Sequence, residues 1–146
     1  MFDELFNLVK EHSGNAIINN TDVPNEKNDA VIHTTAGGIM DHLKNLAGSG
    51  SLHSITDLLK GGNLTGNKEV TAMTHNIAKT ISEKFGLDLS KSEGIVKSLI
   101  PTVMGSLSKK THDPNDNSFT MDGILKSLTG GSGSLGGIMD KVKNMF

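Results

Sequence analysis

Apolar residues recur every three or four positions along most of this 146-residue chain, and no stretch shows the sustained alternation of a half-buried strand. The clearest example lies between residues 67 and 85, where Val70, Met73, Ile77 and Ile81 share one helical face. Clusters of glycine, serine and asparagine separate such segments. The pattern predicts an all-α fold, a compact multi-helix domain with amphipathic terminal helices.

One segment, Ile95 to Leu107, carries apolar residues around too much of its circumference for a surface helix. We therefore expect it at the centre of the fold. Pro101 lies inside it. Because proline has no amide hydrogen and its ring crowds the preceding turn, a kink is expected near residues 97–101.

Helix ends are marked on either side of residue 87. Gly86 followed by Leu87 predicts a left-handed C-terminal cap. Ser90 and Glu93, three residues apart, are typical of a capping box that opens the central helix. Further along, Ser118 or Thr120 is expected to cap a short helix.

An earlier helix is expected over residues 25–46, interrupted by Gly37-Gly38. Each interior glycine costs about 1 kcal/mol relative to alanine, so the pair indicates close packing, a kink or a break. Ile17 and Ile18, in the asparagine-rich segment before it, are expected to turn inward from a loop.

The two ends of the chain each carry an apolar stripe. A Gly/Ser run typical of a flexible linker precedes the C-terminal one, so we expect a helical domain over 1–130 and a tethered amphipathic helix over 131–146. The motif Gly37–Asp41 recurs as Gly136–Asp140. Either two helices obey similar packing rules, or the terminal copy occupies a groove shaped for the first, in the same or a neighbouring molecule.

Four motifs follow one another in an order that resembles a known family: Phe85-Gly86-Leu87-Asp88, the proline-containing apolar helix, His112-Asp113-Pro114-Asn115-Asp116, and Gly123–Leu128. Over about residues 25–130 the chain resembles the YidB-like family of small bacterial proteins of unknown function, in its longer, Asp-Pro-Asn-Asp-loop form. The resemblance implies a bacterial, all-helical protein. It supplies no catalytic residues, and the Gly/Ser tail lies outside its stronger part.

Composition argues against several classes of function. The net charge is −2, all 14 cations are lysines and aromatic residues are few, so we expect no nucleic-acid partner. The chain has no cysteine, which excludes disulfides and thiolate chemistry and fits a reducing compartment. The start is acidic where a secretion signal is basic, and no apolar run is long enough to span a bilayer. A bacterial cytoplasmic location is expected.

The residues offer no strong metal or cofactor site. Asp113, Asn115, Asn117 and Asp122 resemble part of a calcium loop, but Ser118 and Ile124 replace its glycine and bidentate glutamate, so a structural turn is favoured. The glycine pattern at 131–136 lacks the preceding strand that a dinucleotide site requires, and no cofactor is expected. The six histidines are scattered, which predicts surface or boundary positions rather than zinc binding.

These observations favour a non-enzymatic helical module that acts through protein contacts or self-association. Its expected contact residues are Phe2, Leu5, Phe6, Val9, Ile138, Val142 and Met145. The open alternative is that both stripes complete the chain's own core. A second hypothesis is a small-ligand or cation-binding protein that uses the Pro101 kink and the 113–122 loop. A third is membrane-surface association through the N-terminal helix, which its acidic polar face disfavours. We expect no enzyme, because no catalytic constellation is present.

Overall fold

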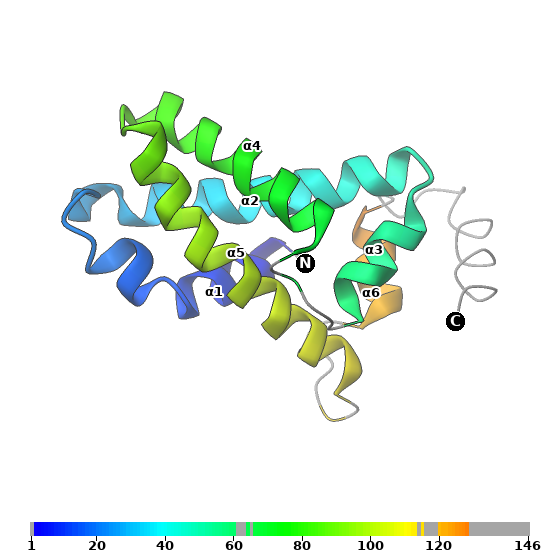
Figure 1. Cartoon of the computed structure of the whole chain (residues 1–146). Coiled ribbons are helices and arrows are strands. Elements are labelled where there is room, and N and C mark those ends of the chain that lie inside the picture. Colours follow the sequence, from blue (N-terminus) through cyan, green and yellow to red (C-terminus); the bar gives the residue numbers. More distant parts are fainter. Residues whose placement is uncertain (1, 61–63, 65, 114, 116–119, 129–146) are drawn as a thin grey trace.

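The computed structural model describes residues 2–60, 64, 66–113, 115 and 120–128. Over these residues the chain folds into α-helices without strands (Figure 1). The helices are α1 (Phe2–Glu11), α2 (Asn28–Gly48), α3 (Leu52–Leu59), α4 (Lys68–Phe85), α5 (Leu89–His112) and α6 (Met121–Leu128). A π-helical turn, η1 (Gly14–Ile18), and a 3-10 turn, η2 (Asn25–Lys27), connect α1 to α2. The all-α prediction is confirmed.

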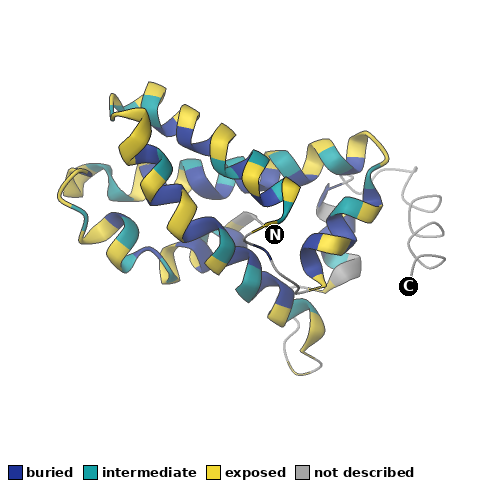
Figure 2. Cartoon of the chain, in the orientation of Figure 1, coloured by how far each residue is buried: buried dark blue, intermediate teal, exposed yellow. Residues whose placement is uncertain are grey.

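Two long helices, α2 and α5, share the centre of the molecule. Helix α5 packs against α4, α3 and α1, and α2 packs against α1, α4, α3 and α6. Figure 2 shows buried residues on the helix sides that face one another and exposed residues on the outside. The expected inward face of α5 is confirmed, since all its members are buried: Ile95, Val96, Leu99, Ile100, Val103, Met104 and Leu107.

Helix α5 continues through Pro101 without a break, from Leu89 to His112. Proline has no backbone N–H, so it cannot donate the hydrogen bond that the carbonyl of Lys97 would accept in a regular helix. Along its length the helix contacts α1, α3 and α4. The buried hydroxyl of Ser108 adds one such contact, donating to the carbonyl oxygen of Leu59 at the end of α3 over 2.9 Å.

The glycine pair in α2 marks close packing and not a break. The helix runs uninterrupted from Asn28 to Gly48. A Cβ atom added at Gly38 would lie 2.5 Å from Cγ1 of Ile77 on α4, whereas one added at Gly37 would meet nothing within 4 Å. Gly38 therefore lets the backbone of α2 lie directly against α4.

Several helix ends follow local chemistry. Gly86 has φ +67° and ends α4 in the left-handed region, as predicted. At the other end of α4, the side chain of Asn67 accepts hydrogen bonds from the amides of Glu69 and Val70. Thr120 caps α6, since its hydroxyl oxygen accepts from the amide of Gly123 over 3.0 Å.

The predicted capping box at Ser90 and Glu93 is wrong. Helix α5 begins at Leu89 and its N-cap is Asp88, so Ser90 already lies inside the first turn. The reason is that the left-handed turn at Gly86 reverses the chain within two residues. Glu93 is then in the second turn, where its carboxylate contacts His75 of α4.

One expectation near the N-terminus also needs correction. Ile17 is fully buried, but Ile18 is 39% exposed, because both residues lie in the η1 turn and only one of its sides faces the core. Helix α1 is amphipathic as expected, and its apolar face packs against α2 and α5.

Candidate functional site

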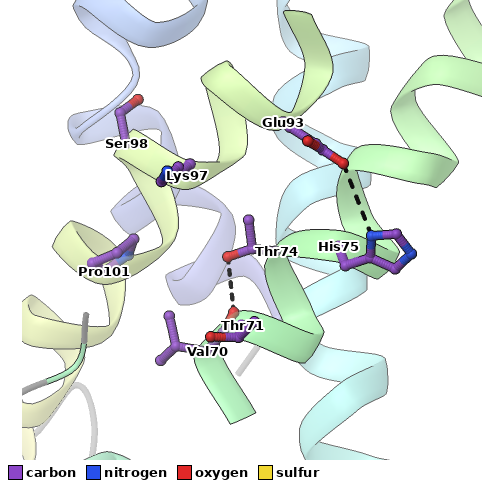
Figure 3. A pocket seen from close by; sticks show the side chains of 8 residues that line it. All are labelled: Val70, Thr71, Thr74, His75, Glu93, Lys97, Ser98 and Pro101. Atoms are coloured by element: carbon purple, nitrogen blue, oxygen red, sulfur yellow. Dashed lines mark hydrogen bonds and ion pairs between the residues drawn. The ribbon is translucent and has the colours of Figure 1, made fainter. Parts of the chain in front are cut away.

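A groove of about 490 Å³ lies between α4 and α5 (Figure 3). Each helix supplies four residues at the spacing of one helical face. From α4 come Val70, Thr71, Thr74 and His75, and from α5 come Glu93, Lys97, Ser98 and Pro101. Figure 3 shows these side chains around the hollow that separates the two helices.

The start of α4 is fixed by its cap. The side-chain oxygen of Asn67 accepts from the amide of Glu69 over 2.7 Å and from that of Val70 over 3.2 Å. These two bonds satisfy amides that the first helical turn leaves free. The groove residues of α4 follow directly, so the cap sets their position.

The hydroxyl groups of the groove are held by backbone carbonyls of their own helices. Thr71 donates to Asn67 over 3.1 Å, Thr74 to Val70 over 2.8 Å and Ser98 to Ile95 over 2.9 Å. Their hydroxyl hydrogens are therefore engaged. The threonines still offer methyl groups and oxygen lone pairs to a ligand.

Three charged or ionisable side chains border the groove. The Nδ1 atom of His75 lies 3.9 Å from a carboxylate oxygen of Glu93, and both side chains are about half exposed, so this contact between α4 and α5 is weak. Lys97, one turn after Glu93, has no ion pair with any described residue. Within the part of the chain that the structure describes, the groove thus presents one cation without a partner.

One hydroxyl–imidazole pair occurs elsewhere. The Oγ atom of Ser106 on α5 lies 2.9 Å from Nε2 of His12 at the end of α1. Neither residue lines the groove, and no carboxylate of the described chain forms an ion pair with His12. A serine nucleophile needs a base that is oriented by a third group next to a substrate site. The contact joins α1 to α5.

A second inter-helix contact lies between α2 and α4. Nε2 of His42 is 2.7 Å from a carboxylate oxygen of Glu69, and the two side chains are 16% and 21% exposed. Close by, a hollow of about 160 Å³ is lined by residues that include Gly38, His42 and Ile77. It is smaller than typical sites for small ligands.

The described residues of the 113–122 loop are not among those that line the groove. The Asp113 carboxylate accepts from the amide of Asn115 over 2.9 Å, the bond of a structural turn. Asn117 and the side chain of Asp122 lie outside the described residues. Over the described chain, no group of three or more histidines and carboxylates could hold a metal ion.

The predicted contact face of the N-terminal helix is corrected for two of its residues. Leu5 and Val9 are 0% exposed, and Phe6 is half-buried with its ring 6.1 Å from that of His33. These side chains complete the chain's own core because α1 docks on α2 and α5. The same docking covers the apolar face that membrane association would use. The side chain of Phe2, and Ile138, Val142 and Met145, lie outside the described residues.

The histidines lie at surface or boundary positions, as the sequence predicts. All six are exposed or half-buried, and none is in the core. None of the helices in the described ranges has the length and hydropathy that a bilayer crossing requires.

The sequence-based ligand hypothesis named the Pro101 kink, which lines the groove, but predicted neither the groove nor the residues opposite it. Thr71, Thr74 and His75 have the spacing of the polar side of an amphipathic helix, which says nothing about a second helix lying beside them. The available signal was Lys97 and Pro101, four residues apart on the helix expected at the centre of the fold.

Comparison with known proteins gives one match. The model of a family described as "Bacterial protein of unknown function (DUF937)", the YidB-like family, matches residues 68–146, more than half of the chain. The match starts at the first residue of α4 instead of near residue 25, and it includes the Gly/Ser tail that the sequence motifs left out. No curated protein and no solved structure matches the chain.

Proposed function

Because the chain belongs to the bacterial DUF937 family, whose function is unknown, membership supplies no activity, and we propose a function from the groove. The protein is a non-enzymatic binding protein that holds a small molecule between α4 and α5. The supporting observation is the groove of about 490 Å³, because sites for small ligands commonly measure about 300–1,000 Å³. All its residues lie in the part of the chain that the family model matches.

Binding without turnover is what these side chains support. Nucleophilic catalysis by a hydroxyl group needs a base within hydrogen-bond reach of that hydroxyl. The hydroxyl groups of Thr71, Thr74 and Ser98 donate to backbone carbonyls instead. At 3.9 Å, His75 and Glu93 are beyond hydrogen-bond length.

The test is a titration of the ¹⁵N-labelled full chain with a mixture of small aliphatic and aromatic carboxylates, amines and alcohols. Amide shifts are expected to concentrate on Thr71, Thr74, Lys97 and Ser98, which line both sides of the groove. Shifts that scatter over the surface, or that gather on other helices, would contradict the proposal.

A matched pair of variants sharpens this test. Thr74→Leu places a larger side chain in the groove and is expected to abolish the shifts. Thr102→Leu is the control, because Thr102 is exposed on α5 outside the groove and makes the same kind of bond, to the carbonyl of Ser98. Ligand shifts that survive Thr74→Leu unchanged would place the binding site elsewhere.

A second candidate function is association through residues 131–146. It is favoured by the first copy of the repeated motif, which packs tightly in α2: Ile39 and Leu43 are 0% exposed, and Gly38 lies against Ile77. The terminal copy carries Ile138 and Val142 at the matching positions, so it repeats a pattern that forms a packing face in this fold.

Light scattering tests this candidate through the mass of the chain in solution. The full chain is expected to be oligomeric, and a chain ending at Gly130 and the full-length Ile138→Lys variant are expected to be monomers. Lys141→Gln is the control, because it leaves the apolar stripe unchanged. A full chain that is already a monomer, with thermal stability lost on truncation, would mean that the segment completes its own core.

A further inference from the structure

We infer that the ligand of the α4–α5 groove has an apolar body and a carboxylate, and that Lys97 is the cation that holds the carboxylate. The inference rests on the proposed function of the groove and names its ligand class. It draws on three properties of the lining: its apolar surface, its engaged hydroxyl groups and its cation, which pairs with no described residue.

The lining favours an apolar body. Val70 and Pro101 face each other across the groove from α4 and α5 and bring no side-chain polar atom (Figure 3). The hydroxyl hydrogens of Thr71 and Thr74 are bonded to backbone carbonyls. A strongly polar ligand would give up hydrogen bonds to water here without gaining matching donors, whereas an aliphatic or aromatic body has no such bonds to give up.

The charges at the groove favour an anionic group. Glu93 has His75 beside it at 3.9 Å, while Lys97 has no ion pair among the described residues. Lysine carries its charge on a long aliphatic stem, which lets the stem cover apolar surface while the ammonium remains in water. An amine ligand would meet that ammonium as a like charge.

Pro101 lines the groove together with Lys97 and affects the backbone of that turn. The residue occupies the position one turn after Lys97, where the missing amide leaves the Lys97 carbonyl without its helical donor. A water molecule or a donor group at this point would satisfy that carbonyl. The carboxylate assignment therefore rests on the charge of Lys97 and not on this carbonyl.

Three probes of equal chain length separate the head group from the apolar body: octanoate, octanol and octylamine. In titrations of the ¹⁵N-labelled full chain, octanoate is expected to bind about five-fold more tightly than octanol, as for one partly exposed charge contact. Octylamine is expected to bind most weakly. The shifted amides are expected to include Thr71, Thr74, Lys97 and Ser98.

Lys97→Gln tests the assigned residue. It is expected to weaken octanoate binding about five-fold, to the level of octanol, and to leave octanol unchanged. The control is Lys79→Gln, because Lys79 is also an exposed lysine but lies on α4 outside the groove lining. Circular dichroism of both variants checks that the fold is retained.

The other outcomes of these titrations separate the carboxylate inference from the proposed function of the groove. Equal affinities for the three probes, tightest binding of octylamine, or an unchanged octanoate affinity in Lys97→Gln would overturn the carboxylate inference and leave the groove function standing. If none of the three probes shifts amides at the groove, the inference is overturned. The proposed function is tested separately, by the titration with the mixture of carboxylates, amines and alcohols.

Discussion

The contact between α2 and α4 at Gly38 makes a sharp prediction about two neighbouring glycines. Gly38→Ala adds a methyl group whose carbon would lie 2.5 Å from Cγ1 and 3.0 Å from Cδ1 of Ile77. Ile77 is only 2% exposed, and its β-branched side chain has one strongly preferred rotamer in a helix. Either the two helices separate or Ile77 leaves that rotamer.

Two opposing terms set the magnitude. Overpacking of this kind costs about 1–3 kcal/mol, and alanine gains about 1 kcal/mol over glycine inside a helix. Gly38→Ala is therefore expected to lower the free energy of unfolding by about 0–2 kcal/mol. Gly37→Ala has nothing within 4 Å of its new carbon and is expected to raise it by about 1 kcal/mol.

The difference between the two variants isolates the contact, because the helix-propensity term is the same in both. It should be about 1–3 kcal/mol. Urea unfolding of the full chain, followed by circular dichroism at 25 °C, measures it, provided that the slope of the transition is unchanged. If Gly38→Ala stabilises the protein as much as Gly37→Ala, the close approach of α2 to α4 is refuted.

A third variant checks the partner atom. Ile77→Ala removes the atoms that the new methyl group would meet. The loss in free energy of unfolding caused by Ile77→Ala should therefore be about 1–2 kcal/mol smaller in the Gly38→Ala background than in the wild type. Additive effects would show that Gly38 and Ile77 are not in contact.

The remaining predictions concern helix ends and the α2–α4 contact. Asn67→Ala is expected to lower the free energy of unfolding by about 1 kcal/mol, because two amides of α4 lose their acceptor, whereas Asn67→Asp keeps it; urea unfolding tells them apart, and equal stabilities would contradict the cap. Gly86→Ala, at φ +67°, is expected to cost about 1–2 kcal/mol and Gly86→Asn less; no loss in thermal or urea unfolding would mean that this turn is not left-handed. For His42 and Glu69, 2.7 Å apart and mostly buried, a double-mutant cycle with His42→Gln and Glu69→Gln is expected to give a coupling of about 1 kcal/mol, and additivity would refute the bond.

Helical periodicity was enough to predict the fold class and the inward faces of the helices. The apolar positions of α5 from Ile95 to Leu107 are all in the core, and those of α4 begin and end where Asn67 and Gly86 cap the helix. These features depend on residues within about four positions of each other, which a single sequence displays directly.

Other features could not be predicted from the sequence. Ser90 and Glu93 have the spacing of a capping box, but α5 begins at Leu89 with Asp88 as its N-cap, so this local pattern placed the helix start two residues too late. The N-terminal stripe fits an exposed contact face as well as a core face, and only the docking of α1 decides between them. The groove needs both α4 and α5 in place, so no spacing within one helix predicts it.

The bond between His12 and Ser106 ties the beginning of the described chain to its last long helix, across 94 residues. Ribosomes add about 5–20 residues per second, so roughly 5–20 s separate the synthesis of the two partners. During that time α1 can pack only on segments made before α5, such as α2. Its docking is completed when α5 emerges. Synthesis speed and the supply of chaperones during this interval therefore bear on the yield of folded protein.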